Sequence, residues 1–184
     1  MFRCLSLVMA ILLLAGCTSY AEVAPTRITI KDAYSIDPQI AWSRTQDGKR
    51  ETWTVDGPLL EQLGFITGLE EGDTLYRVLG EKHAPTYRPT MSESEIMEFV
   101  VDSLISTGAH SVTAANLRPA PFGAWPGFRF DLSFQYPSGL DGLGTVLGAR
   151  RDGGLHLILY TGARLHYFDK HKGTVEALFA SIRT

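Results

Sequence analysis

The sequence predicts an α+β fold, in which a central antiparallel sheet of about six or more strands is covered by two or three helices. Two observations carry this prediction. Segments that alternate apolar and polar residues follow one another and are joined by short glycine-containing turns, as in β-hairpins. Amphipathic segments with a helical period lie between these groups, and the regular strand–helix alternation of a parallel sheet is absent from the sequence.

The first 16 residues are predicted to be a lipoprotein signal peptide. Arg3 places a positive charge near the start, and residues 5–14 form an apolar run. This run is too short for a permanent membrane span, which needs about 20 residues. The pattern Leu14-Ala15-Gly16-Cys17 follows, and it resembles the lipobox at which bacterial lipoproteins are acylated and cleaved. The alternative is an ordinary secretory signal that contains a cysteine.

Cleavage before Cys17 would leave residues 17–25 as a lipidated cysteine and tether, and residues 26–184 as a single α+β domain. Cys4 leaves with the signal peptide, so the mature chain keeps one cysteine and can form no intramolecular disulfide. Acylation makes membrane lipid a partner, and two acyl chains suffice for stable anchoring. Thr18 follows the cysteine in place of aspartate, and by resemblance to known sorting rules this favours the outer membrane, facing the periplasm.

Three strands are predicted at the start of the domain, over residues 27–31, 39–44 and 51–55. Asp47-Gly48 lies between the last two and favours a hairpin turn. A helix is then predicted from Asp56, whose carboxylate can cap the free N–H groups of a first turn. The apolar face of this helix would be formed by Leu59, Leu60 and Leu63.

The next segments are predicted as a strand over residues 74–79 and an exposed loop over residues 80–90, which is polar and contains two prolines. The clearest helix covers residues 92–107. Ser92 and Glu95 form a capping box, in which each side chain accepts a hydrogen bond from the other residue's backbone N–H. The apolar face of this helix contains Met97, Val100, Val101, Leu104 and Ile105.

The last part of the chain predicts three or four strands and a final helix. Residues 128–136 alternate aromatic or apolar with polar side chains, which is typical of a strand with one face exposed to water. Residues 143–151 and 155–160 form the next pair, joined by a tight turn at residues 152–154. The apolar face of the final helix contains Val175, Leu178, Phe179 and Ile182.

Three segments carry a resemblance to known proteins: Trp-Thr-Val-Asp-Gly at residues 53–57, Phe-Gly-Ala-Trp-Pro-Gly-Phe-Arg-Phe at residues 122–130, and His-Tyr-Phe at residues 166–168. Together they resemble a family of uncharacterised bacterial lipoproteins, over most of the mature chain. The order of elements is also similar to the PsbP-like fold of photosystem extrinsic proteins and a Ran-binding nuclear-import factor. That resemblance implies a sheet between helices and binding to protein partners, with no shared active site.

Residues 119–127 are the candidate contact surface for a partner. Three prolines stiffen this predicted loop, which carries the large apolar side chains of Phe122 and Trp125. Exposed aromatic side chains on a rigid loop are good binding anchors. The alternative is that both rings plug the end of the sheet core. The candidate partner-binding residues are Phe122, Trp125, Phe128 and Arg129.

Two polar patterns are candidate anion sites. Arg129, Arg150 and Arg151 share a face if their strands are neighbours, and arginine there could pair with carboxylate or phosphate. A solvated sheet face is the alternative. The glycine-rich residues 139–144 precede a strand, whereas a phosphate loop opens a helix, so a hairpin turn is predicted there.

A weak metal site is suggested by His166, Asp169 and His171, which lie close together where a strand leads into a helix. Imidazole and carboxylate groups are zinc ligands. His156, on the adjoining strand, would be a further ligand if it shared a face with His166. The alternative is that Asp169 caps the helix and both histidines beside it are exposed.

The sequence lacks a Gly-x-Ser-x-Gly elbow, a P-loop and a His-Glu-x-x-His helix. Its net charge of -3 argues against a nucleic acid partner. We therefore expect a non-enzymatic envelope lipoprotein that needs no cofactor and binds another envelope component, a protein. The alternatives are an envelope enzyme or a carrier of a metal or small ligand, with a site around His156, His166 and Asp169, and a surface-displayed structural antigen.

Overall fold

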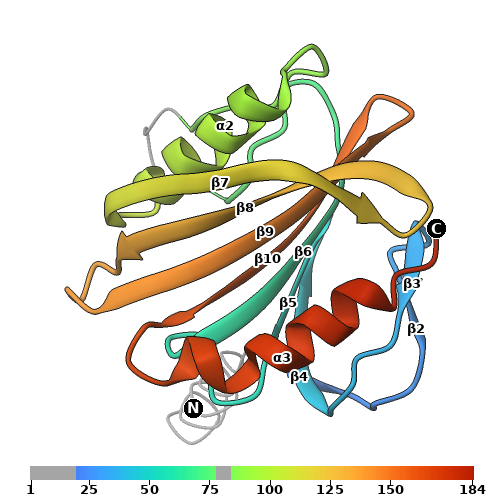
Figure 1. Ribbon diagram of the computed structural model, residues 1–184, viewed down its shortest axis with the longest axis vertical. Coiled ribbons are helices and arrows are strands. Elements are labelled where there is room, and N and C mark those ends of the chain that lie inside the picture. The colour runs from blue at the N-terminus through green and yellow to red at the C-terminus, as the bar shows by residue number, and fades with distance from the viewer. Residues whose placement is uncertain (1–19, 78–83) are drawn as a thin grey trace, which may run out of the picture.

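The computed structural model describes residues 20–77 and 84–184, and its centre is an eight-stranded antiparallel sheet (Figure 1). The predicted α+β class is therefore confirmed. From one edge to the other, the strands are β1 (Ala21–Val23), β4 (Trp42–Asp47), β5 (Arg50–Thr54), β6 (Glu61–Leu69), β10 (Gly154–Ala163), β9 (Asp141–Arg151), β8 (Trp125–Gln135) and β7 (His110–Phe122).

Both faces of the sheet are covered. The helix α3 (Tyr167–Ala180) and the two-stranded ribbon of β2 (Ile28–Ile30) and β3 (Tyr34–Ile36) lie on one face, and the helix α2 (Glu93–Ser106) lies on the other (Figure 1). Successive side chains of a strand point to opposite faces. On β6, Leu63 and Phe65 therefore join the core under α3, whereas Ile66 joins the core under α2. An irregularity in the pairing with β10 lies between Ile66 and Leu69, and Leu69 also joins the core under α2.

Each helix covers its own apolar core, the α3 core on one face of the sheet and the α2 core on the other. The α3 core includes Trp42, Trp53, Phe65, Phe122, Tyr160 and Leu178, and the α2 core includes Tyr87, Phe99, Phe128, Phe130, Val146 and Leu157. Within the described residues, no helix has both the length and the apolar character of a membrane span.

The predicted helix over residues 92–107 is confirmed as α2, and its capping box is formed. Glu95 N donates to Ser92 Oγ over 3.3 Å, and Ser92 N donates to Glu95 Oε2 over 2.7 Å. Ile96, Phe99 and Val100 are buried on the face that the apolar period predicts. Local sequence signals were sufficient here because a cap and a helical period act within a few residues.

The helix predicted from Asp56 is wrong. Leu60 N and Glu61 N both donate to the carbonyl of Gly57, which forms a turn, and the chain then enters β6. Leu59 is 83% exposed, so the expected apolar face does not exist. The spacing of the leucines fits a helix, but pairing of this segment with β5 and β10 buries Leu63 and Phe65 instead.

Three further expectations are corrected. The expected strand over residues 74–79 is absent from its described part, where Thr74 forms a single bridge with Thr86, and residues 78–83 lie outside the described chain. The range 17–25 expected as a tether contains the strand β1, because Ala21–Val23 pair with β4. The expected loop over residues 119–127 is a β-hairpin that turns between Phe122 and Trp125.

Prolines made that hairpin hard to predict, since proline cannot donate a hydrogen bond to a neighbouring strand. Pro119 and Pro121 are tolerated because β7 is the edge strand of the sheet.

The turn predicted in the glycine-rich stretch 139–144 is confirmed: Tyr136 N donates to the carbonyl of Leu140, and β9 begins at Asp141.

Gly148→Ala tests how tightly the α2 core packs against the sheet. A Cβ at Gly148 would lie 2.6 Å from Phe128 Cζ and 2.7 Å from Leu157 Cδ2, and both side chains are fully buried. Overpacking of this kind should lower the free energy of unfolding by about 1–3 kcal/mol in denaturant titrations. Gly173→Ala in α3 is the control, because nothing lies within 4 Å of its added Cβ. Gly173→Ala should stabilise the protein by about 0.5–1 kcal/mol. If the two substitutions changed the free energy of unfolding equally, the tight packing around Gly148 would be contradicted.

Candidate functional site

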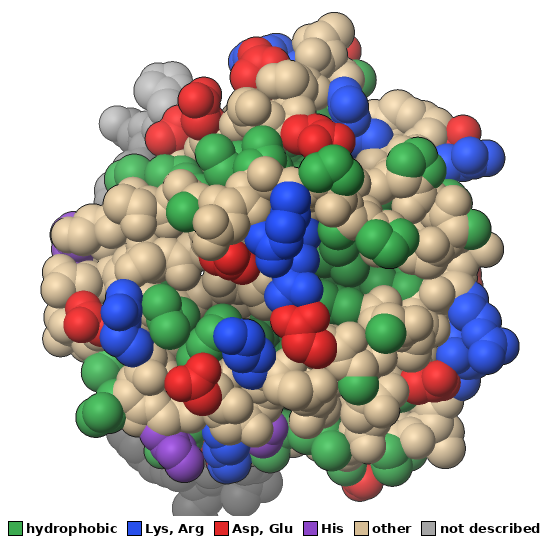
Figure 2. Space-filling model, in the orientation of Figure 1, with side chains coloured by type: hydrophobic (Ala, Val, Ile, Leu, Met, Phe, Trp, Pro, Cys, Tyr) green, Lys and Arg blue, Asp and Glu red, His purple; other side chains and the backbone are tan. Residues whose placement is uncertain are grey.

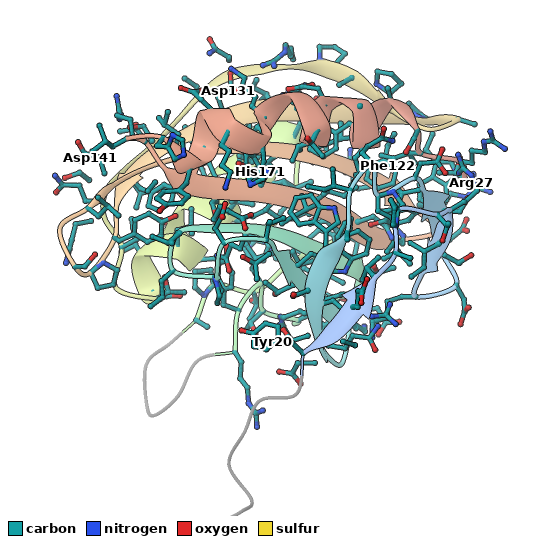
Figure 3. The ribbon with its side chains drawn as sticks, turned by 90° about the horizontal axis from the view of Figure 1, so that it is seen from below. Tyr20, Arg27, Phe122, Asp131, Asp141 and His171 are labelled. Atoms are coloured by element: carbon teal, nitrogen blue, oxygen red, sulfur yellow. The ribbon has the colours of Figure 1, made fainter. Side chains whose placement is uncertain are left out.

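The β7–β8 hairpin holds the two aromatic residues that the sequence singled out. Phe122 is fully buried at the end of the α3 core, where its ring meets Tyr34 at a centroid distance of 4.8 Å (Figure 3). Trp125 is partly exposed and stacks on Phe122 at 5.8 Å, with 11° between the rings. Its other neighbour is His156, at 5.1 Å. Phe122 therefore plugs the core, and Trp125 presents part of its ring to the surface.

The tip of this hairpin is held by the C-terminal segment of the chain. Gly123 has φ +61°, and a Cβ there would lie 2.9 Å from Thr184 Cγ2 and 3.1 Å from Ile182 Cγ2. Ala124 N donates to Thr184 Oγ1 over 3.1 Å. Residues 119–121 and 123–127 line a shallow hollow of about 470 Å³. The hairpin is thus a rigid, proline-rich surface with one partly exposed tryptophan.

Phe128 and Arg129 do not join that surface. Phe128 lies in the α2 core, stacked on Phe130 with 3° between the rings. Arg129 projects from the opposite face toward α3, where its guanidinium makes a two-pronged ion pair with Glu176. Its Nε donates to Thr145 Oγ1 over 3.0 Å. Arg129 thus ties the sheet to α3 and lies in the wall of a groove beside the hairpin.

This groove, of about 380 Å³, runs between the β7–β9 strands and α3. Charged side chains of both signs line it, and Figure 2 shows basic and acidic groups gathered at the middle of this face beside apolar ones. Arg118 Nη1 lies 3.5 Å from Asp131 Oδ2. Ion pairing with Arg129 lowers the pKa of the Glu176 carboxyl. The charged residues of the groove are Arg118, Arg129, Asp131, Lys172 and Glu176.

The three arginines do not share a face, contrary to one sequence interpretation. Arg150 lies on the α2 side, where its Nη1 donates to the carbonyl of Met91 over 2.7 Å. Arg129 lies on the α3 side. Arg151 is exposed at the β9–β10 turn and pairs with the neighbouring Asp152. No arginine cluster for an anion is formed by these residues.

The structure also separates the histidines of the alternative site. His156 is buried near the start of β10, and His166 is exposed beyond the far end of this strand. Seven residues of extended strand from His156 to Ala163 span about 23 Å. Asp169 is exposed in the first turn of α3. His156, His166 and Asp169 therefore form no common site.

His171 alone among the metal candidates meets other possible ligands. Its Nε2 lies 3.0 Å from Asp56 Oδ2, and one ligand atom each from Asp56, Glu61 and His171 lie within 4.8 Å of one another. Hydrogen bonds from Lys170 and then His171 lower the pKa of the Asp56 carboxyl. Sequence reasoning missed this cluster, because Asp56 and Glu61 were assigned to a helix and lie more than 100 residues before His171.

His156 is expected to make the stability of the fold depend on pH. Burial lowers the pKa of His156 below its ordinary value near 6.5, because the charged imidazole is disfavoured there. The unfolded chain therefore binds the proton of His156 more readily than the folded chain does. The stability that the neutral, buried imidazole contributes is complete above pH 6.5, and it is lost as pH falls through the folded-state pKa. Between pH 7 and 5, unfolding free energies measured in denaturant should fall less for His156→Gln than for the wild type. His166→Gln, at an exposed position, should follow the wild-type profile.

Comparisons with known proteins give a likeness of fold alone. No protein-family model matches the chain, and no curated protein matches its sequence. A crystal structure from Bacteroides thetaiotaomicron VPI-5482 has a TM-score of 0.50 at 9% identity, covering 91% of this chain and 49% of that one, so this chain spans about half its length. Cyanobacterial PsbP (CyanoP) from Synechocystis sp. PCC 6803 gives 0.49 at 14% identity, over 93% and 95%. LpqN of Mycobacterium tuberculosis, described as involved in cell envelope biogenesis, gives 0.37 at 8% identity, over 92% and 86%.

Proposed function

We propose that this protein is a lipid-anchored lipoprotein of the bacterial envelope, which acts as a non-enzymatic binding or assembly module for another envelope protein. The lipobox pattern ending at Cys17 supports the anchor, although these residues lie outside the described chain. By resemblance to sorting rules, Thr18 favours the outer membrane. The observation that carries the binding role is the partly exposed Trp125 on a hairpin fixed by the C-terminal segment.

The short connection between the anchor and the sheet supports a partner close to the membrane. β1 begins at Ala21 and pairs with β4, so only three residues separate it from Cys17. A chain extends by at most about 3.6 Å per residue, which limits the distance from Cys17 to Ala21 to about 14 Å. A domain held this tightly would meet proteins embedded in the membrane or lying on it.

The hairpin surface has the features of a protein contact. Tryptophan and arginine are the residue types that dominate binding energies at protein interfaces. Trp125 adjoins exposed prolines, and its position is set by contacts with Phe122 and His156. A surface that is rigid before binding loses little conformational entropy on association. The groove that contains Arg118 could add charged contacts at the rim.

Cys17→Ser tests the anchor. Without the thiol no thioether to lipid can form, so the variant should lose palmitate labelling and leave the detergent-extractable membrane fraction, or remain uncleaved. The readouts are metabolic labelling and fractionation of whole cells. Cys4→Ser is the matched control, since it lies in the segment that cleavage removes, and it should label normally. A Cys17→Ser protein that still carried palmitate would disprove the lipobox interpretation.

Trp125→Ala tests the contact surface. Loss of an interface tryptophan commonly costs about 2 kcal/mol or more, which corresponds to about 30-fold weaker binding. Native lipidated protein should be cross-linked in intact cells, and the captured partner compared between variants. Trp125→Ala should greatly reduce the capture of a discrete, reproducible partner. Ile105→Ala, at a 49% exposed apolar position on α2, is the control and should leave capture unchanged.

A second variant separates binding from stability, because Trp125 also contacts the buried Phe122. Ala124→Glu places a charge at the exposed tip without removing a core contact, and it should also reduce capture. If both variants kept the partner of the wild-type protein, the hairpin would not be the contact surface. Equal capture of abundant envelope proteins by every variant would contradict the binding role itself.

A further inference from the structure

We infer that Asp56, Glu61 and His171 form a binding site for a divalent metal ion, with zinc as the best-fitting metal. Asp56 lies in the turn after β5, Glu61 begins β6, and His171 lies on the side of α3 that faces the sheet (Figure 3). One ligand atom from each residue lies within 4.8 Å of the other two. Two segments far apart in the sequence, residues 56–61 and α3, thus direct metal-binding groups at one point.

Glu61 is the residue that points most directly to a cation. Its side chain is fully buried, and its Oε1 accepts hydrogen bonds from Thr54 Oγ1 at 2.7 Å, Val55 N at 2.5 Å and Asp56 N at 3.0 Å. Its Oε2 is also buried and has no hydrogen-bond donor among the described residues. A buried carboxylate with an open oxygen is unfavourable. A metal ion bound to Oε2 would remove that cost.

The other two ligands are already close to a metal-binding arrangement. Asp56 Oδ2 lies 3.0 Å from His171 Nε2, and both Asp56 oxygens lie 2.7 Å from Lys170 Nζ. The Lys170 ammonium offsets only one of the two carboxylate charges when both are ionised. Lys170 is exposed, so its side chain can turn into solvent when a doubly charged ion takes its place.

One imidazole and two carboxylates match a zinc site with three protein ligands and one position open to water. Zinc binds these groups at about 2.0–2.2 Å, which puts ligand atoms about 3.4 Å apart in a tetrahedron. The ligand atoms lie within 4.8 Å of one another, so the side chains must close by up to about 1.4 Å. The three donors on Glu61 Oε1 hold that carboxylate in place, which is how metal ligands are commonly oriented.

The surroundings of His171 differ from those of the exposed His166 nearby. The ring of Trp42, 2% exposed, lies 6.0 Å from that of His171 and covers it on one side. His166 is exposed at the start of α3, and its ring meets that of its neighbour Tyr167 edge to face at 5.2 Å. A metal in the cluster would connect α3 to the β5–β6 turn, so binding would stabilise the folded chain by linkage.

The test is zinc binding to the full-length protein, purified in detergent and stripped with a chelator. Titration against a chromophoric competitor should show one zinc per chain, and the thermal midpoint should rise with zinc. Cobalt should give the visible absorption bands of a tetrahedral site. Glu61→Gln and His171→Gln should each weaken binding by about 100-fold, whereas His166→Gln, at an exposed position five residues away, should bind like the wild type.

Lys170→Gln gives a result of opposite sign. Loss of the ammonium that now occupies both Asp56 oxygens should tighten zinc binding by about tenfold, since the ion no longer has to displace a positive charge. Circular dichroism checks that each variant is folded, and if Glu61→Gln is unfolded, His171→Gln decides. Absence of stoichiometric binding, or binding that both ligand variants retain, would overturn the site and leave water as the partner of Glu61 Oε2.

Discussion

The burial of β10 on both of its faces is the constraint on which the rest of the structure depends. Every residue of β10 after Gly154 is buried, and β6 and β9 pair with it on either side. A strand in this position needs apolar cover above and below the sheet, and the burial of that surface is the main favourable term in folding. The α2 core and the α3 core supply this cover, so both helices and the β2–β3 ribbon are required to complete one sheet.

The position of α3 determines both candidate sites. Val175 and Leu178 of α3 pack against the sheet, and the ion pair between Glu176 and Arg129 of β8 fixes the helix further. Its first half carries His171 to the carboxylates of the β5–β6 turn. The segment after its last turn supports the tip of the β7–β8 hairpin through Thr184. The metal cluster and the hairpin surface therefore lie at opposite ends of the same helix and share its placement.

Much of the fold could be predicted because its signals are local. The capping box of Ser92 and Glu95 located α2, and the alternation along residues 128–136 located β8. The leucines after Asp56 misled because their spacing fits a helix, and this local pattern is overridden when the following segment pairs with β5 and β10. The hairpin at residues 119–127 was missed because its prolines argue against a strand unless the strand is known to lie at an edge.

The sequence by itself determined the α+β class, the helix α2, the glycine-containing turns and the lipobox pattern, since each depends on neighbouring residues or on a short period. Tertiary structure alone decided which aromatic side chain stays at the surface: Phe122 turns into the α3 core and Trp125 remains partly exposed. It also decided that His171 meets Asp56, 115 residues away, while His156 and His166 lie apart. Strand register and helix packing control such contacts, and neither is encoded in the spacing of residues along one segment.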